Sequence, residues 1–176
     1  MKKKNDSELR LRPYIPSDAE VITSWIKSEE DQRKWSFDRY SKYPVTSKDM
    51  NEKYLDNNGD CDKADDFIPI TAMEGDKIVG HMILRYPSAD RKIIRFGFVI
   101  VDDIIRGKGY GKRMLELSIR YAFDILKARK ITLGVFANNE PAYNCYKVAG
   151  FKENGETFYC ECMGEQWKEI EMELSK

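Results

Sequence analysis

The chain has 176 residues, of which 41% are hydrophobic and 34% are charged, a composition typical of a folded protein. A chain of this length buries roughly two-thirds of its unfolded surface, so we expect one domain over residues 1–176. The 30 basic and 30 acidic residues cancel, which argues against nucleic acid or a membrane surface as a partner. No apolar run has the length of a signal peptide or a membrane span, and we expect a cytoplasmic protein.

The four cysteines predict free thiols and no metal site. Cys61, Cys145, Cys160 and Cys162 have neither the density of a disulfide scaffold nor the paired spacing of a zinc ribbon. A metal held by Cys160 and Cys162 would need two further ligands, and His81 is the single histidine of the chain.

The first third of the chain predicts a strand, a helix, an aromatic segment and a loop. Residues 8–13 alternate polar and apolar side chains and end at a proline, as a short strand does. Ser17 can cap the helix that follows, with Glu20 completing a capping box. The aromatic segment 35–43 suits either packing under a loop or one wall of a pocket for a cation, and we favour packing. Residues 56–66 are polar and turn-rich and predict a loop.

The rest of the chain predicts strands and helices mixed in one unit. Strands are expected over residues 67–73, 77–86, 93–101, 131–136, 158–163 and 166–174. An amphipathic helix begins at Gly111. Asn138 and Asn139 are expected to cap a second, shorter helix that ends at Gly150. This mixture indicates an α/β protein.

The centre of the pattern is a glycine turn at residues 106–112, which joins the apolar run 96–101 to the amphipathic helix. Alternate glycines let a ligand approach the backbone, and the start of a helix offers unpaired N–H groups and a positive dipole. That combination binds phosphate. Four cations lie in or beside the turn, so the expected ligand carries several negative charges; they are Arg106, Lys108, Lys112 and Arg113.

Two familiar nucleotide loops do not fit this turn. The dinucleotide fingerprint needs G-x-G-x-x-G, whereas Gly107, Gly109 and Gly111 alternate with single residues. The phosphate loop of nucleoside triphosphatases needs serine or threonine after its lysine, and Arg113 follows Lys112 here. A second motif is therefore needed to interpret the turn.

That motif is N-E-P-A-Y-N-C-Y-K-V-A-G-F at residues 139–151. Together with R-x-x-G-x-G at residues 106–111, it resembles the GNAT superfamily of acetyl-CoA-dependent N-acetyltransferases, nearest the ribosomal-protein N-acetyltransferase branch. The resemblance implies an α/β fold with a mixed, mostly antiparallel sheet of six or seven strands and helices on both faces. It also implies acetyl-CoA as co-substrate, a primary amine as acceptor and no metal.

The resemblance assigns roles to individual residues. Backbone groups of Val99, Ile100 and Val101 would pair with the pantetheine arm, and Asn139 would contact it with its side chain. Tyr146 occupies the position of the general acid that returns a proton to the leaving thiolate. The pyrophosphate would rest on the turn formed by Arg106, Gly107, Lys108, Gly109, Tyr110, Gly111 and Lys112. The residues themselves leave two plainer roles open, because Tyr146 suits core packing and Asn139 suits a helix cap.

The general base is open at this stage. Many relatives carry a glutamate where this chain has Arg95, so the base is His81, an acidic residue (Asp102, Asp103 or Glu161) or a water relay, which we take as the default. Arg95 also leaves open a non-catalytic acyl-CoA-binding or sensor module. The acceptor, whether a small amine or a protein N-terminus, has no motif, and either a monomer or a homodimer is compatible with the sequence.

Overall fold

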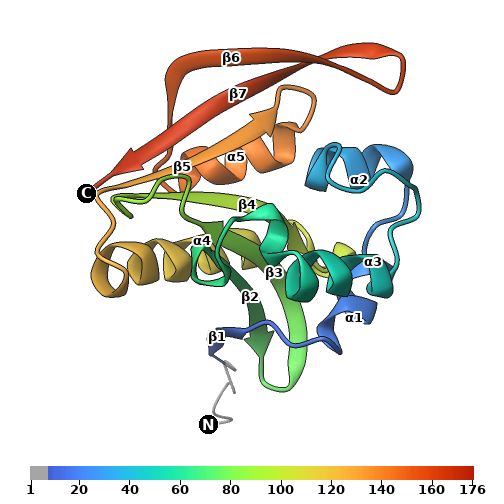
Figure 1. The fold of residues 1–176 in the computed structure, drawn as a ribbon, viewed down its shortest axis with the longest axis horizontal. Helices are drawn as coiled ribbons and strands as arrows, with labels where there is room; N and C mark the ends of the chain where they lie inside the picture. Colours follow the sequence, from blue (N-terminus) through green and yellow to red (C-terminus); the bar gives the residue numbers. More distant parts are fainter. Residues whose placement is uncertain (1–7) are drawn as a thin grey trace, which may run out of the picture.

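The computed structural model describes residues 8–176 and shows one seven-stranded sheet in the order β1-β2-β3-β4-β5-β7-β6 (Figure 1). All neighbouring strands are antiparallel except β4 and β5, which are parallel. The strands are β1 (Leu9–Pro13), β2 (Phe67–Glu74), β3 (Lys77–Arg85), β4 (Ile93–Val101), β5 (Lys130–Phe136), β6 (Lys152–Cys162) and β7 (Glu165–Ser175). The predicted mixed, mostly antiparallel sheet is confirmed, in its seven-stranded form.

Helices cover both faces of this sheet, as predicted (Figure 1). The α-helices are α1 (Asp18–Ser24), α2 (Glu29–Ser36), α3 (Ser47–Asn51), α4 (Tyr110–Arg120) and α5 (Glu140–Val148). One-turn π-helices at Glu52–Asp56 and Tyr121–Ile125 follow α3 and α4 directly. Short 3₁₀ turns lie at Asn58–Asp60, Ala64–Asp66 and Asp103–Ile105. The first two give partial order to the segment expected to be a loop.

Two buried clusters hold the layers together. The larger one lies between the sheet and helices α4 and α5, with Phe96, Leu115, Leu133 and Phe151 almost fully buried. The other lies under α1, α2 and α3 and is rich in aromatic side chains such as Trp35. Because burial of apolar side chains is the main stabilising term, these clusters fix the two helical layers to opposite faces of the sheet.

Strands β4 and β5 diverge soon after they begin. Their pairing is limited to three residue pairs, the last being Arg95 with Thr132. Further along, β4 pairs with β3 alone, and a register shift accompanies Phe98, whose φ is 49°. The carbonyl of Phe98 accepts a hydrogen bond from the Trp35 indole at 2.9 Å. The second half of β4 therefore presents an unpaired edge toward β5.

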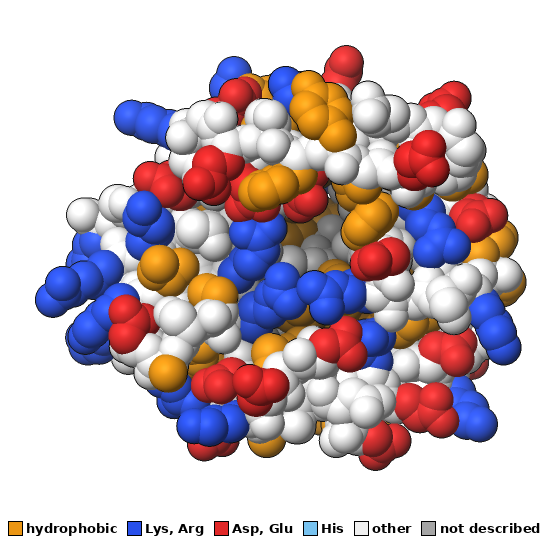
Figure 2. Space-filling view, turned by 45° about the horizontal axis from the view of Figure 1, so that its top comes forward, with side chains coloured by type: hydrophobic (Ala, Val, Ile, Leu, Met, Phe, Trp, Pro, Cys, Tyr) orange, Lys and Arg blue, Asp and Glu red, His pale blue; other side chains and the backbone are white. Residues whose placement is uncertain are grey.

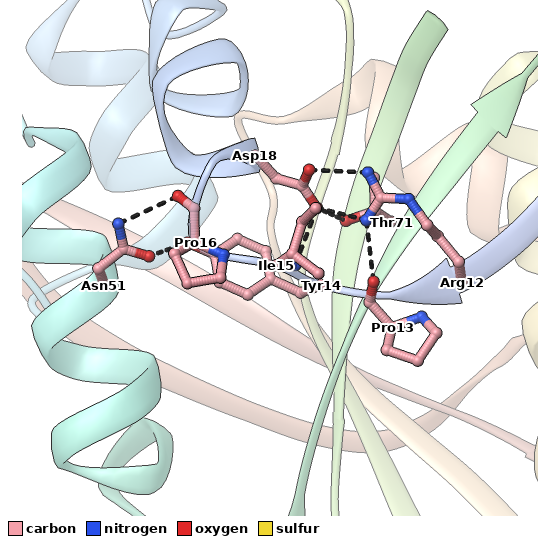
Figure 3. A network of polar contacts seen from close by, with 8 residues as sticks. All are labelled: Arg12, Pro13, Tyr14, Ile15, Pro16, Asp18, Asn51 and Thr71. Atoms are coloured by element: carbon pink, nitrogen blue, oxygen red, sulfur yellow. Dashed lines mark hydrogen bonds and ion pairs between the residues drawn. The ribbon is translucent and has the colours of Figure 1, made fainter. Parts of the chain in front are cut away.

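The buried carboxylate of Asp18 connects α1 to strands β1 and β2 through hydrogen bonds (Figure 3). Asp18 is 1% exposed and accepts two 2.7 Å hydrogen bonds from Arg12 and one from Thr71. The backbone N–H of Ile15 adds a fourth bond. Burial alone would raise the pKa of Asp18, but these hydrogen bonds together lower it below the ordinary value.

The expected capping box at the first helix is wrong. Ser17 precedes α1 in an α-helical conformation (φ −67°, ψ −16°), and its side chain makes no cap hydrogen bond. An N-cap side chain reaches the first turn from an extended backbone. Thr46 has that conformation and forms a full capping box with Asp49 at the start of α3.

The closing hairpin is longer than the sequence indicates. Strand β6 starts at Lys152, six residues before the apolar alternation that predicted it, and most of its side chains are exposed on the edge of the sheet. All four cysteines are free thiols. Within residues 8–176, no helix is long and apolar enough to cross a membrane, and no three His, Cys, Asp or Glu side chains form a group that could hold a metal ion.

Candidate active site

A cavity of about 940 Å³ opens between the diverging strands β4 and β5. It is lined at one end by the glycine turn and the start of α5, and at the other by side chains of α2, β3, β5 and β7. The face in Figure 2 is hollowed near its middle, and Lys and Arg side chains gather beside this hollow with Asp and Glu around it. The lining of the cavity contains both cations and carboxylates.

The cavity collects nearly every residue that the sequence assigned to cofactor binding. The lining includes Val99, Ile100, Val101, Arg106, Gly107, Gly109, Tyr110, Gly111, Lys112 and Asn139. Lys108 is exposed in the same turn but lies outside the lining. The two motifs, about thirty residues apart in sequence, therefore meet at one end of one cavity.

The glycine turn has the conformation and the free N–H groups that an anion needs. Gly107 and Gly109 have φ of 77° and 85°, and no atom lies within 4 Å of a Cβ built on either residue. The first backbone bond of α4 joins the N–H of Arg113 to the carbonyl of Gly109 at 3.1 Å. The N–H groups of the preceding residues have no acceptor inside the helix. The turn thus fits a phosphate-bearing ligand.

The absence of a side chain at Gly111 allows close helix packing as well as approach of a ligand to the backbone. A Cβ on this residue would lie 3.3 Å from Sγ of Cys145 on α5 and 3.7 Å from the side chain of Val101. Without a side chain here, α4 and α5 approach each other closely at the mouth of the cavity. The close approach brings the second motif next to the turn.

Not all cations of the turn are free for a ligand. Lys112 pairs with Glu116 at 3.3 Å, and Arg113 lies 3.9 Å from Glu74. Arg106 donates from Nε to the carbonyl of Val101 at 3.2 Å, with no acidic partner in the described chain. Arg106 is therefore the cation best placed to add charge to the N–H groups of the turn.

Asn139 occupies the N-cap position of α5, as predicted, but its side chain makes no cap hydrogen bond. Its backbone (φ −107°, ψ 61°) lies outside the extended region from which a cap side chain reaches the first turn. Asn138 lies one residue before the cap position. Asn139 also lines the cavity, so its side-chain amide is available to a ligand.

Tyr146 lies on α5, 7% exposed, and lines the cavity. Its ring packs edge-on against Phe151 at a centroid distance of 6.2 Å. No group among residues 8–176 forms a hydrogen bond with its hydroxyl. Burial raises the pKa of Tyr146, and the neighbouring Cys145 adds to the rise. The phenol is therefore protonated at neutral pH, as a proton donor must be.

The base candidates from the sequence do not reach the cavity. His81 is fully buried, its Nε2 lies 2.8 Å from the hydroxyl of Tyr54, and burial lowers its pKa to about 3. Asp102 bonds with Lys77 and the N–H of Ile104. None of these groups, nor Asp103 or Glu161, lines the cavity.

Arg95 points to a carboxylate that sequence reasoning missed. The guanidinium donates two hydrogen bonds to Glu171 on β7, at 2.6 and 2.7 Å. Glu169 lies two residues earlier on the same face, 3.7 Å from Arg95, and lines the cavity. Burial, with the charge of Glu171, raises the pKa of Glu169 above the ordinary value. No motif marks this residue, because only the fold brings β7 beside β5, close enough for Arg95 of β4 to reach its carboxylates.

The aromatic segment packs into the core, as predicted, and also borders the cavity. Trp35 stacks on Tyr40 at 5.8 Å and contacts Phe98 at 5.2 Å, which is core packing. Trp35 and Phe37 also line the cavity, together with Asp31 and Asp38. Packing holds the rings in place, and their exposed edges form part of the wall.

Parts of this sequence are similar to those of named acetyltransferases. A spermine/spermidine N(1)-acetyltransferase of Bacillus subtilis is 39% identical over 56 residues, a match that covers 32% of this chain and 37% of the relative. A prophage-derived N-acetyltransferase of the same organism is 32% identical over 86 residues, 48% of each chain. The matches therefore span between a third and a half of these relatives.

Solved structures share the fold over nearly the whole chain. Spermidine N-acetyltransferase of Vibrio cholerae, crystallised with CoA and spermine, superposes with a TM-score of 0.78 over 96% of both chains at 20% identity. A putative phosphinothricin N-acetyltransferase gives 0.73 at 22% identity, over 96% of this chain and 98% of the other. The family model for acetyltransferases matches residues 24–151. The chain belongs to the acetyltransferase (GNAT) family.

Proposed function

We propose that this protein transfers an acetyl group from acetyl-CoA to a primary amine. The proposal rests on one observation: the glycine turn, the unpaired edge of β4 and the hydroxyl of Tyr146 border a single cavity. Family membership and the acetyltransferase names of the relatives support it. Their names include a polyamine enzyme and do not include a ribosomal-protein acetyltransferase, so that branch stays a prediction.

In this proposal the residues divide into binding and proton-transfer roles. N–H groups of the glycine turn and Arg106 hold the pyrophosphate, while the free edge of β4 at Val99–Val101 pairs with the pantetheine arm and Asn139 contacts it. Positioning of this kind lowers the barrier of a two-substrate reaction by roughly 7–11 kcal/mol at best. Tyr146, kept neutral by burial, gives a proton to the leaving thiolate. We also propose a single domain over residues 1–176.

The test is release of free thiol from acetyl-CoA across a panel of amines. The panel contains polyamines, amino acids, aminoglycosides and peptides with free N-termini, since the acceptor class is not fixed by the cavity. Thiol release that depends on one class of amine supports the proposal and identifies the acceptor. Tight acetyl-CoA binding without amine-dependent release would favour the sensor module instead.

A further inference from the structure

We propose that Glu169 accepts the proton of the substrate amine, as the catalytic base of the acetyl transfer proposed above. Three carboxylates line the cavity among the described residues. Asp31 lies on α2, and the exposed Asp38 follows that helix. Glu169 alone comes from the sheet, where β4 and β5 begin to diverge. The inference rests on the proposed function and gives it the base that Arg95 left unassigned.

The sheet places Glu169 at the closed end of the divergence. Arg95 pairs with Thr132, the last contact between β4 and β5. Gly134 follows two residues later and so faces the same side of β5. A Cβ on Gly134 would lie only 1.9 Å from Oε1 of Glu169. The carboxylate therefore occupies the space above β5 that a side chain at residue 134 would fill.

Arg95 contacts two carboxylates of β7, those of Glu169 and Glu171. Its two short hydrogen bonds engage Glu171, which is 7% exposed. Glu169 has a single ion pair at 3.7 Å with Arg95, beyond hydrogen-bond distance, and its side chain is 31% exposed. Glu171 thus takes both hydrogen bonds of the arginine, while Glu169 lines the cavity. Arg95 acts as a positioning residue, with a charge opposite to that of the glutamate that many relatives carry at this position.

The surroundings make Glu169 a stronger base than an exposed glutamate. The charged and titratable neighbours are Arg95 on β4, Arg85 on β3, Cys160 on β6 and Glu171 on its own strand. Burial and Glu171 raise the pKa of Glu169, and the two arginines oppose the rise. The net rise reduces the difference between the pKa of Glu169 and the pKa of an alkylammonium, which is about 10. Proton transfer from the ammonium to Glu169 is therefore more favourable than transfer to an exposed glutamate.

In the proposed reaction the substrate ammonium gives one proton to Glu169, and the freed nitrogen lone pair forms a bond to the thioester carbonyl carbon. The C–S bond then breaks, the thiolate takes a proton from Tyr146, and the nitrogen releases its second proton to solvent. Solvent restores Tyr146, and Glu169 loses its proton before the next turnover. One ammonium ion and one thioester thus give an amide, a thiol and one proton.

The test compares the pH dependence of kcat/KM for thiol release in the wild type and Glu169→Gln. Without the base, only free amine reacts, so the variant should be about a hundredfold slower at pH 7. Its rate should then rise about tenfold per pH unit toward the pKa of the amine, whereas the wild type is level above the pKa of Glu169. Glu165→Gln, exposed on the same strand, removes an equal charge and should match the wild type.

A second variant, Gly134→Ala, moves the carboxylate without removing it, because the new methyl group would overlap Oε1. It should slow turnover in the wild type and have little further effect in a Glu169→Ala background. If kcat/KM of Glu169→Gln is lowered by the same factor at every pH, or equals that of the wild type at every pH, Glu169 is not the base, and the proposed function is unaffected. A wild type that releases no thiol with any amine overturns the proposed function itself.

Discussion

Replacing Tyr146 with phenylalanine separates proton donation from packing. The ring is buried and contacts Phe151, and phenylalanine keeps both the ring and that contact. The hydroxyl has no hydrogen-bond partner in residues 8–176. Its removal should therefore change the free energy of unfolding by less than about 1 kcal/mol.

The effect on turnover should be much larger. A positioned general acid contributes roughly a hundredfold or more, which corresponds to about 2.7 kcal/mol of transition-state stabilisation. We expect kcat of Tyr146→Phe to fall by that factor, with cofactor affinity and Tm close to the wild type. Alanine at this site would not separate the roles, because the lost ring contacts would cost about 3–5 kcal/mol.

The assay measures kcat by thiol release, acetyl-CoA affinity by calorimetry and Tm by thermal unfolding. Tyr143→Phe is the matched control, since Tyr143 lies on the same helix but directs its hydroxyl to Glu153, away from the main cavity. The control should keep full turnover. If Tyr146→Phe also kept full turnover, or lost only stability, the tyrosine would be a packing residue and the acid assignment would be wrong.

Three further outcomes follow from the structure. Gly109→Ala should weaken acetyl-CoA binding at least tenfold in calorimetry. Gly155→Ala is the control, because Gly155 has a similar φ (91°) and equally open space. It should have the same backbone strain of about 1–2 kcal/mol and bind acetyl-CoA normally. Asp18→Asn should lower the free energy of unfolding in urea by roughly 2–4 kcal/mol. Because folding lowers the pKa of Asp18, this difference should persist above about pH 4 and shrink as pH falls further. Glu171→Gln should remove the stronger of the two ion pairs of Arg95, leaving the 3.7 Å contact with Glu169, and lower Tm, an effect that a surface pair would not show.

The strands and the glycine turn were predictable because their signals are local. The apolar run 96–101 and the two isoleucines before Arg95 predicted a strand over residues 93–101, and β4 has those bounds. The turn at residues 106–112 needs glycines at positive φ, and these stand out in the sequence. The helix of the first motif follows from its apolar periodicity, and the helix of the second motif from its cap residues and Gly150. These local signals therefore predicted the residues that form one end of the cavity.

The missed features depend on distant contacts or on backbone angles. The capping box expected at Ser17 formed at Thr46, because a cap requires an extended residue and the sequence does not specify ψ. The polar first half of β6 gave no alternating pattern, and its partner strand holds it in place. Glu169 gained its setting from Gly134 and Arg95, on two other strands. No spacing along the chain could have predicted that meeting.

The most direct test of acetyl transfer follows the acetyl group itself. Acetyl-CoA labelled with ¹³C in its acetyl group is incubated with the wild-type protein and the amine that gives the fastest thiol release, and the products are analysed by mass spectrometry. We predict labelled N-acetylamine and free CoA in equal amounts, both abolished when the amine is omitted. Label that stays on CoA, or thiol released without labelled amide, would contradict the account.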